Sequence, residues 1–166
     1  MLRQTLLLAL LILCALDAAA QGVTLPEARR VELENGTVLL LNEKHDVPLI
    51  GLRAVIRGGA ATDPEGLYGL ASLFSAVIEK GAGERDAAEF AEAVDSAGGS
   101  LSASSGLESI TVSANFMARD ADLMIELLAD MLRRPTLSRG EMDKVRARRI
   151  NFIRAAKDGN LNALMP

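Results

Sequence analysis

The chain contains few side chains that could carry out chemistry. Its 166 residues include one histidine, His45, and one cysteine, Cys14. Protein zinc sites use three or four ligands, mostly histidine nitrogens and cysteine thiolates, with at most one or two carboxylates. A single histidine cannot build such a site within this chain. His45 follows a predicted strand at the start of a loop, where an exposed side chain is expected rather than a ligand or a general base.

Other catalytic motifs are missing as well. The sequence has no Gly-x-x-x-x-Gly-Lys phosphate loop, no Gly-x-Gly-x-x-Gly turn after a strand and no Gly-x-Ser-x-Gly elbow. On a predicted helix over residues 67–80, one side carries Ser72, Ser75, Ala76 and Glu79, at spacing i, i+3, i+4 and i+7. A serine nucleophile there would need a base, and the sequence offers none nearby. This side is interpreted as solvated or closely packed.

Composition and charge narrow the class of protein. Hydrophobic residues make up 49%, aromatic residues 3%, and the net charge is −4. These values exclude collagen-like and disordered chains, and one cysteine excludes a disulfide scaffold. Residues 63–130 hold 13 acids and 3 bases, whereas residues 133–157 hold 9 bases and 2 acids. The simpler interpretation is that these charges lie on solvated helix faces. The role of the basic segment at 133–157 stays open. No aromatic residues alternate with the basic ones, so nucleic-acid binding is not expected.

The first 20 residues have the pattern of a secretory signal peptide. A short basic start is followed by the apolar run Leu6–Leu16 and by three alanines that end at Ala20. The run is too short to span a bilayer, which takes about 20 residues, so no stable membrane span is expected. Cleavage after Ala20 would also remove Cys14. The pattern predicts export to the periplasm or to the outside of the cell.

Periodicity and turn signals predict nine elements in the order β-β-β-α-α-β-β-α-α. They are a hairpin over residues 32–41 turning at Asn35-Gly36, a strand at 49–57, helices at 67–80 and 85–97, strands at 100–105 and 107–115, and helices at 118–134 and 138–157. The apolar stripes predicted for the first and third helices are Leu67, Leu70, Phe74, Val77 and Ile78, and Met124, Leu128, Met131 and Leu132. This order predicts an α+β fold, a mostly antiparallel sheet with helices packed on one face. One domain is expected over residues 28–166, truncated at its C-terminus.

Residues 69–81 read Gly-Leu-Ala-Ser-Leu-Phe-Ser-Ala-Val-Ile-Glu-Lys-Gly. This segment resembles the motif helix of the pitrilysin/insulinase family of zinc peptidases, which in active members reads Gly-Leu-Ala-His-x-x-Glu-His before Lys-Gly. Asn35-Gly36 and Pro48 match the opening hairpin and its exit. Residues 98–103 resemble the Gly-x-x-x-Asn-Ala strand, and residues 128–131 resemble the Leu-Ala-Asp helix. The resemblance implies one N-terminal half-domain of such a peptidase.

The chain departs from this family at every position that binds the metal or activates the water bound to it. Ser72, Ser75 and Ala76 stand where active relatives have the first histidine, the glutamate and the second histidine. The third ligand, a glutamate about 76 residues further on, falls on Phe152, with Val145 one helical repeat earlier. Two imidazoles at i and i+4 chelate zinc, and the glutamate between them activates the bound water. Hydroxyl, methyl and phenyl groups do neither, so no catalytic residue and no metal ligand is expected here.

The resemblance implies a function for a chain without the motif. Family members are built from two similar halves, or from two subunits, that enclose a chamber, and several pair a zinc-bearing chain with a relative that lacks the motif. This implies a non-catalytic subunit without a cofactor of its own, paired with a zinc-bearing homologue that processes peptides. An extended peptide could add to the edge of the strand at 100–105, near Ser102 and Ala103.

Three alternatives stay open. The chain could be a structural or interaction protein without a substrate, as are the respiratory-complex core subunits of the family. It could be a fragment of a longer protein. It could also be an active zinc metalloendopeptidase that uses ligands outside the motif.

Overall fold

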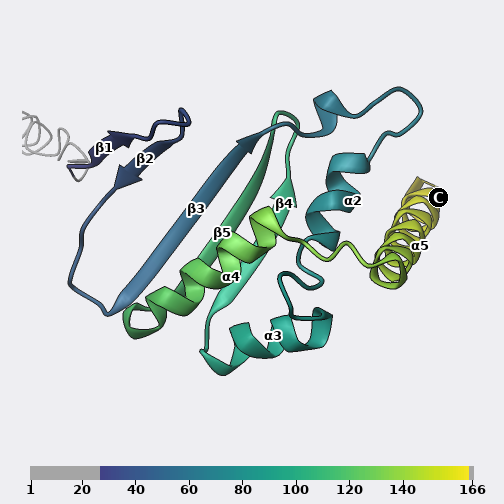
Figure 1. Ribbon diagram of the computed structural model, residues 1–166. Helices are drawn as coiled ribbons and strands as arrows, with labels where there is room; N and C mark the ends of the chain where they lie inside the picture. Colours follow the sequence, from purple (N-terminus) through teal and green to yellow (C-terminus); the bar gives the residue numbers. More distant parts are fainter. Residues whose placement is uncertain (1–26, 165–166) are drawn as a thin grey trace, which may run out of the picture. The chain divides into compact units, whose positions relative to one another are not determined.

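A computed structural model describes residues 27–164 (Figure 1). The predicted signal peptide over residues 1–20 lies outside the described residues. The chain divides into two compact units, one ending at Asp46 and one beginning at Val47. The first unit contains an antiparallel hairpin of β1 (Arg29–Glu32) and β2 (Val38–Leu41). Its turn has Gly36 at φ 79°, and the Asn35 side chain accepts a hydrogen bond from the Thr37 N–H at 3.0 Å. The predicted Asn-Gly hairpin is confirmed.

The second unit is built on a three-stranded antiparallel sheet. Its strands are β3 (Leu49–Arg57), β4 (Ser100–Ser105) and β5 (Ser109–Met117), in the spatial order β3-β5-β4. The register pairs Ala114 of β5 with Leu52 on one side and with Leu101 on the other. Alternate residues therefore form rows that share one face of the sheet. The strand at 49–57 and the strand pair that turns at Gly106 were both predicted.

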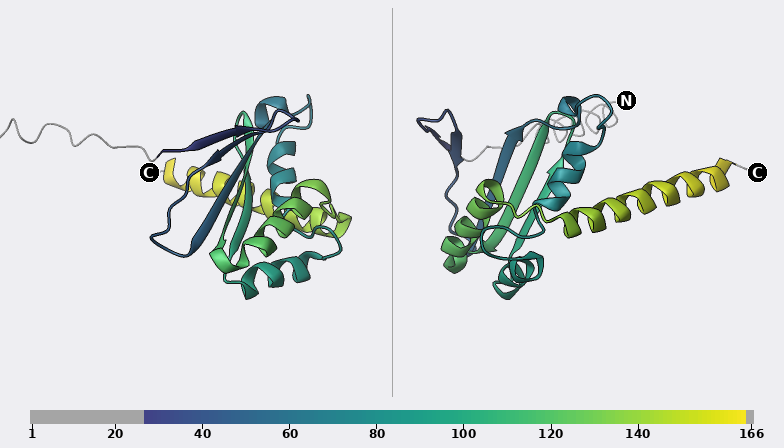
Figure 2. Two further views of the ribbon diagram at one scale, coloured as in Figure 1. Left: turned by 60° about the vertical axis from the view of Figure 1, so that its left-hand side comes forward. Right: turned by 45° about the vertical axis from the view of Figure 1, so that its right-hand side comes forward.

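Helices α2 (Leu70–Val77), α3 (Ala87–Ser96), α4 (Ala121–Arg133) and α5 (Arg139–Leu164) complete the unit, with short 3-10 turns at Ala60–Thr62 and Ala118–Asp120. Helices α2 and α3 contact β4, α4 contacts β5, and α5 contacts α2. Figure 2 shows α2, α3 and α4 on the same side of the sheet, whereas α5 runs outward from the body. The predicted α+β fold, with helices on one face, is confirmed. Among the helices of residues 27–164, none combines the length and apolar character that crossing a bilayer requires.

The core lies between the sheet and these helices. From β5 it receives Val112, Ala114 and Phe116, all at most 1% exposed. The facing side chains of α4 are Met124, Leu127, Leu128 and Met131. Helix α3 adds Phe90 and Val94, and Ile78, directly after α2, also belongs to the core. The opposite face of the sheet carries small polar residues, such as Ser102 and Ser113, which are paired across β4 and β5. In β4 and β5 the alternation of core-facing and polar residues thus marks the face that the helices cover.

The stripe predicted for the first helix is wrong for three of its five residues. Leu67 precedes the helix, and Leu67, Leu70 and Phe74 are 56%, 44% and 39% exposed. The buried residues of α2 are Ala71, Ser75 and Val77, and Ile78 follows directly after it. Small side chains at Ala71 and Ser75 let the helix backbone lie close to β4, so Ser75 belongs to the buried side and not to an open polar face. In α4 the predicted Leu132 is 39% exposed, and Leu127 is buried instead.

Candidate functional site

The motif helix α2 is fixed at its start by Asp63. Its two carboxylate oxygens accept hydrogen bonds from the Gly69 N–H at 2.7 Å and from the Ala71 N–H at 2.8 Å. The first N–H groups of a helix have no partner within the helix, so an acidic side chain satisfies them well. The sequence predicts no element between the strand at 49–57 and the helix at 67–80, and this role was missed because Asp63 lies several residues before the helix. Asp63 positions the segment that carries the motif.

Replacing Asp63 by alanine is expected to lower the free energy of unfolding by about 1 kcal/mol, as the loss of a helix-capping carboxylate does. Urea denaturation followed by circular dichroism measures this difference. Glu65→Ala is the matched control, because Glu65 is an exposed acid in the same loop. Equal stability of the D63A and E65A variants would contradict the assigned role.

The three motif positions have different environments. Ser75 is 1% exposed, and its hydroxyl donates to the Ser72 carbonyl at 3.0 Å. The Ser72 hydroxyl accepts a hydrogen bond from Arg149 Nη1 of α5 at 2.6 Å. Ala76 is half-buried and faces a groove. The Ser75 hydroxyl is bonded to its own helix and the Ser72 hydroxyl to an arginine. The two serines therefore do not form a pair of nucleophile and base.

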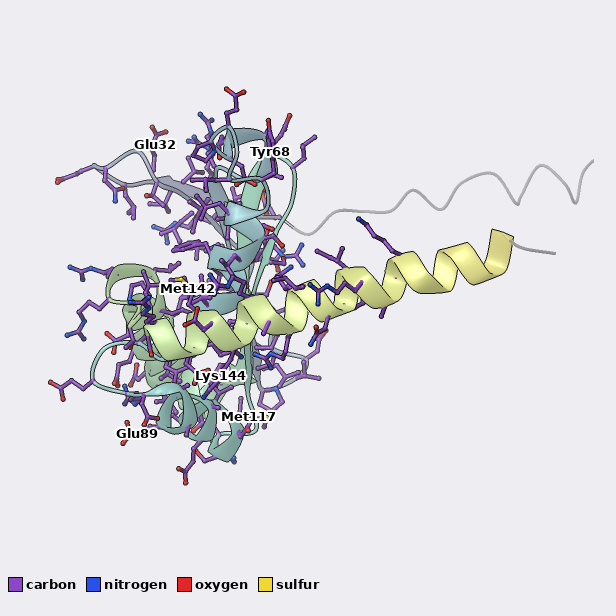
Figure 3. The ribbon with its side chains drawn as sticks, turned by 90° about the vertical axis from the view of Figure 1, so that its right-hand side faces the viewer. Glu32, Tyr68, Glu89, Met117, Met142 and Lys144 are labelled. Atoms are coloured by element: carbon purple, nitrogen blue, oxygen red, sulfur yellow. The ribbon has the colours of Figure 1, made fainter. Side chains whose placement is uncertain are left out.

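A groove of about 480 Å³ lies between α2 and α5, and we call it the α2–α5 groove. One wall is formed by α2 and the two residues that soon follow it, the other wall by α5; the lining residues are Ala76, Glu79, Lys80, Val145, Arg148, Arg149, Phe152 and Ile153. Val145 is 3% exposed and anchors α5 on α2, whereas Phe152 is 76% exposed. Figure 3 views α5 from the side, with Met142 and Lys144 marking its first turns. The two positions that the sequence offered for a third metal ligand therefore do lie at the motif helix.

The residues around the motif do not fit zinc. They offer hydroxyl oxygens, a methyl group, a phenyl ring and guanidinium groups, and a guanidinium carries positive charge and no acceptor. Glu79 is the acidic side chain of the α2–α5 groove. Within residues 27–164, no group of three or more His, Cys, Asp or Glu side chains has a geometry that could hold a metal ion. The described residues around the motif therefore do not supply the set of ligands that zinc requires.

Glu79 connects the motif helix to the edge of the sheet. Its Oε1 atom accepts a hydrogen bond from the Ala103 N–H of β4 at 2.5 Å. Strand β4 is an edge strand, so this N–H points away from β5. Ser102, the other residue predicted to contact a peptide, is exposed on the polar face of the sheet. One backbone donor of the predicted peptide-binding edge is thus already occupied by a side chain of the same chain.

The basic segment separates into residues with different contacts. Arg146 pairs with Asp143 on α5 at 3.0 Å, while Arg149 binds Ser72 and Arg148 lines the groove.

The only histidine, His45, is about nine-tenths exposed and lies 4.0 Å from the Glu43 carboxylate. It lies in the first unit, whereas the motif lies in the second.

A second polar cluster is structural. The buried carboxylate of Asp130 on α4 bonds Arg134 at 2.6 Å and lies 3.8 Å from Arg85, which also pairs with Glu126 at 2.8 Å. The hydrogen bond to Asp130 and its negative charge raise the pKa of Arg134 above an already high ordinary value. A raised pKa stabilises the fold below that value, so this contribution does not change near neutral pH. The cluster joins the loop before α3 to the end of α4.

Comparison with known proteins agrees with the family resemblance of the sequence. The family model described as insulinase, peptidase family M16, matches residues 37–164. A Helicobacter pylori protein named non-peptidase homolog YmxG is 26% identical over 108 residues, which are 65% of this chain and 25% of that protein. The chain thus spans about a quarter of the length of this curated relative.

Two solved structures share the fold. The inactive domain of a peptidase M16 from Pseudomonas fluorescens superposes with a TM-score of 0.68 at 17% identity, covering 73% of this chain and 30% of that chain. A protease from Helicobacter pylori superposes with a TM-score of 0.66 at 22% identity, covering 74% and 30%. Both matches cover about three quarters of this chain but only 30% of the solved chain, which confirms the predicted half-domain. Because the family model covers most of the residues, the chain belongs to the insulinase family of peptidases, M16.

Proposed function

We propose that the chain is a non-catalytic member of the insulinase family that pairs with a zinc-bearing homologue. The observation that carries this proposal is the motif helix itself. Ser72 binds Arg149, Ser75 is buried and Ala76 faces Phe152 across the groove, so none of these three positions offers a metal ligand or a base for metal-bound water. The printed names of the Helicobacter relative and of the Pseudomonas domain support the same interpretation.

In this proposal the partner supplies zinc and the activated water, and this chain forms part of the chamber wall. Edge strand β4 offers backbone groups to which an extended peptide could add. The Ala103 N–H is held by Glu79, so a peptide would either displace that carboxylate or pair with Leu101 and Ser105, whose backbone groups point to the same side as those of Ala103. The predicted signal peptide would bring the pair to the periplasm or to the outside of the cell.

The first test concerns metal and activity. The chain purified from the exported fraction is expected to contain far less than one equivalent of zinc and to cleave no peptide in a mixed library. A homologue that carries the complete His-x-x-Glu-His motif, purified in the same way, is the positive control for the metal analysis, because two imidazoles at i and i+4 chelate zinc. Stoichiometric zinc in the unmodified chain, or cleavage that a chelator abolishes, would contradict a non-catalytic role.

The second test concerns pairing. Co-expression with a homologue that carries the His-x-x-Glu-His motif is expected to give a complex in size-exclusion chromatography and to raise peptide cleavage above that of the homologue alone. Substituting the partner's motif histidines is the control, because it should abolish cleavage while the complex persists. Equal cleavage with and without this chain would contradict the pairing and favour a structural or interaction role.

A further inference from the structure

The α2–α5 groove carries more positive than negative charge. Lys80, Arg148 and Arg149 line it together with one carboxylate, Glu79. Three cations against one anion leave a net charge of +2. The Glu79 carboxylate is also engaged, because it accepts from the Ala103 N–H and lies 3.9 Å from Lys80. The two arginines are therefore the groups that could attract an anion.

Arg149 is held in a fixed position for this role. A guanidinium has five N–H donors in a rigid plane, and the Ser72 hydroxyl accepts from one of its nitrogens, Nη1, at 2.6 Å. This bond anchors the group at the motif helix while the other donors remain able to bind a planar carboxylate with two parallel hydrogen bonds. Arg146 differs, because Asp143 already neutralises it at 3.0 Å.

Apolar side chains lie next to the arginines. Ala76 is half-buried and Val145 is buried among the residues that line the groove, whereas Phe152 and Ile153 are 76% and 54% exposed. Phe152 and Ile153 follow Arg149 at i+3 and i+4, which places them about 5–6 Å from it on one helix side. An exposed apolar patch bordered by charge is typical of a binding site.

We infer that the α2–α5 groove binds the C-terminus of a peptide that ends in an apolar residue. The terminal carboxylate pairs with Arg149 and Arg148, and the last side chain packs on Phe152 and Ile153. A carboxylate and an apolar side chain on one residue match the short separation of these groups. An acidic side chain beside an apolar neighbour fits less well, because successive side chains of an extended peptide point to opposite sides.

This inference rests on the proposed function in one respect. Cleavage by a peptidase partner creates peptides with new free carboxylates, so a chain beside that partner would meet this ligand. Binding itself needs no partner and no metal, and it is measured on this chain alone. A negative binding result would therefore leave the zinc and pairing tests unaffected, and a failure of those tests would leave the binding result unaffected.

The test uses three acetylated, fluorescently labelled hexapeptides in an anisotropy titration. The first ends in leucine with a free carboxylate, the second is the same peptide as an amide, and the third is an amide with aspartate before the leucine. The free acid is expected to bind at least about tenfold more tightly than either amide, and more weakly at high salt. Equal affinity for acid and amide would overturn the inference. Equal affinity for the aspartate peptide would overturn recognition of the C-terminus in favour of an acidic side chain.

Variants locate the binding to the groove. Arg149→Gln, Arg148→Gln and Phe152→Ala are each expected to weaken binding of the free acid by about tenfold, while Arg146→Gln, on the same helix, leaves it unchanged. Arg148 and Phe152 are exposed, so these variants keep the test valid if loss of the Ser72 contact disturbs α5. Circular dichroism confirms folding. Unchanged binding in the R148Q and F152A variants would overturn the assignment to this groove.

Discussion

Replacing Met124 by alanine is expected to lower the free energy of unfolding by about 2–5 kcal/mol. Met124 is 0% exposed and lies on α4 within the cluster that includes Phe116 and Leu127. The substitution removes buried atoms and leaves a cavity that rigid neighbours fill only in part. Small domains are stable by about 5–15 kcal/mol in total, so the loss is a large share. Urea denaturation followed by circular dichroism measures it.

Ile125→Ala is the matched control for this substitution. Ile125 is the next residue on the same helix and is 53% exposed. Its replacement is expected to change the free energy of unfolding by less than about 0.5 kcal/mol. Met124→Leu, which nearly conserves volume, should cost less than about 1.5 kcal/mol. Similar losses for M124A and I125A would mean that α4 does not pack on the sheet through the face described above.

Gly99→Ala is expected to cost about 1–3 kcal/mol because the core has no space for a methyl group there. A Cβ atom on Gly99 would lie 2.5 Å from Cδ1 and Cε1 of Phe116 and 2.7 Å from Cζ. Phe116 is 1% exposed, so its ring can move only if the surrounding core moves with it. The same denaturation experiment gives the difference.

Two further variants show whether the ring causes this loss. Gly140→Ala, in the first turn of α5, has only the Ser138 hydroxyl at 3.8 Å from the new methyl group, so it should be neutral or slightly stabilising. In the double variant Gly99→Ala with Phe116→Leu, the smaller side chain leaves room for the methyl group. The double variant should therefore lose less than the sum of the two single variants. Strict additivity would show that the clash is absent.

Much of the fold could be predicted from local signals. The strand at 49–57 was predicted with its observed bounds, because an apolar run lies between Pro48 and the glycines at 58 and 59. The hairpin was predicted from Asn35-Gly36, whose turn geometry is a property of those two residues. These elements depend on short-range sterics, which the sequence shows directly.

The orientation of α2 could not be predicted in the same way. Periodicity assumes that large apolar residues are buried, yet Phe74 is exposed and Ser75 is buried. The position of β4 decides this, because a helix that lies close to a strand needs small side chains at the contact. The requirement comes from a segment about 25 residues further along the chain, and no local pattern reports it.

The candidate site was predicted in part. The substituted motif could be identified from the matching residues that flank it, Gly69-Leu70-Ala71 and Lys80-Gly81. The contacts of the site could not, because Arg149 binds Ser72 from 77 residues away and Glu79 binds Ala103 from 24 residues away. Such pairs depend on how α5 and β4 pack against α2. The same packing shows that Val145 is buried under the helix while Phe152 stays open.

The hydrogen bond between Arg149 and Ser72 has a consequence for redesign of this helix pair. Replacing Ser72 alone by histidine would place an imidazole directly against a guanidinium, and the cation would disfavour a metal ion there. Installing a metal site would thus take substitutions on both helices, on α2 to supply ligands and on α5 to remove the arginine. Editing the motif alone would leave a positive charge beside the new ligands.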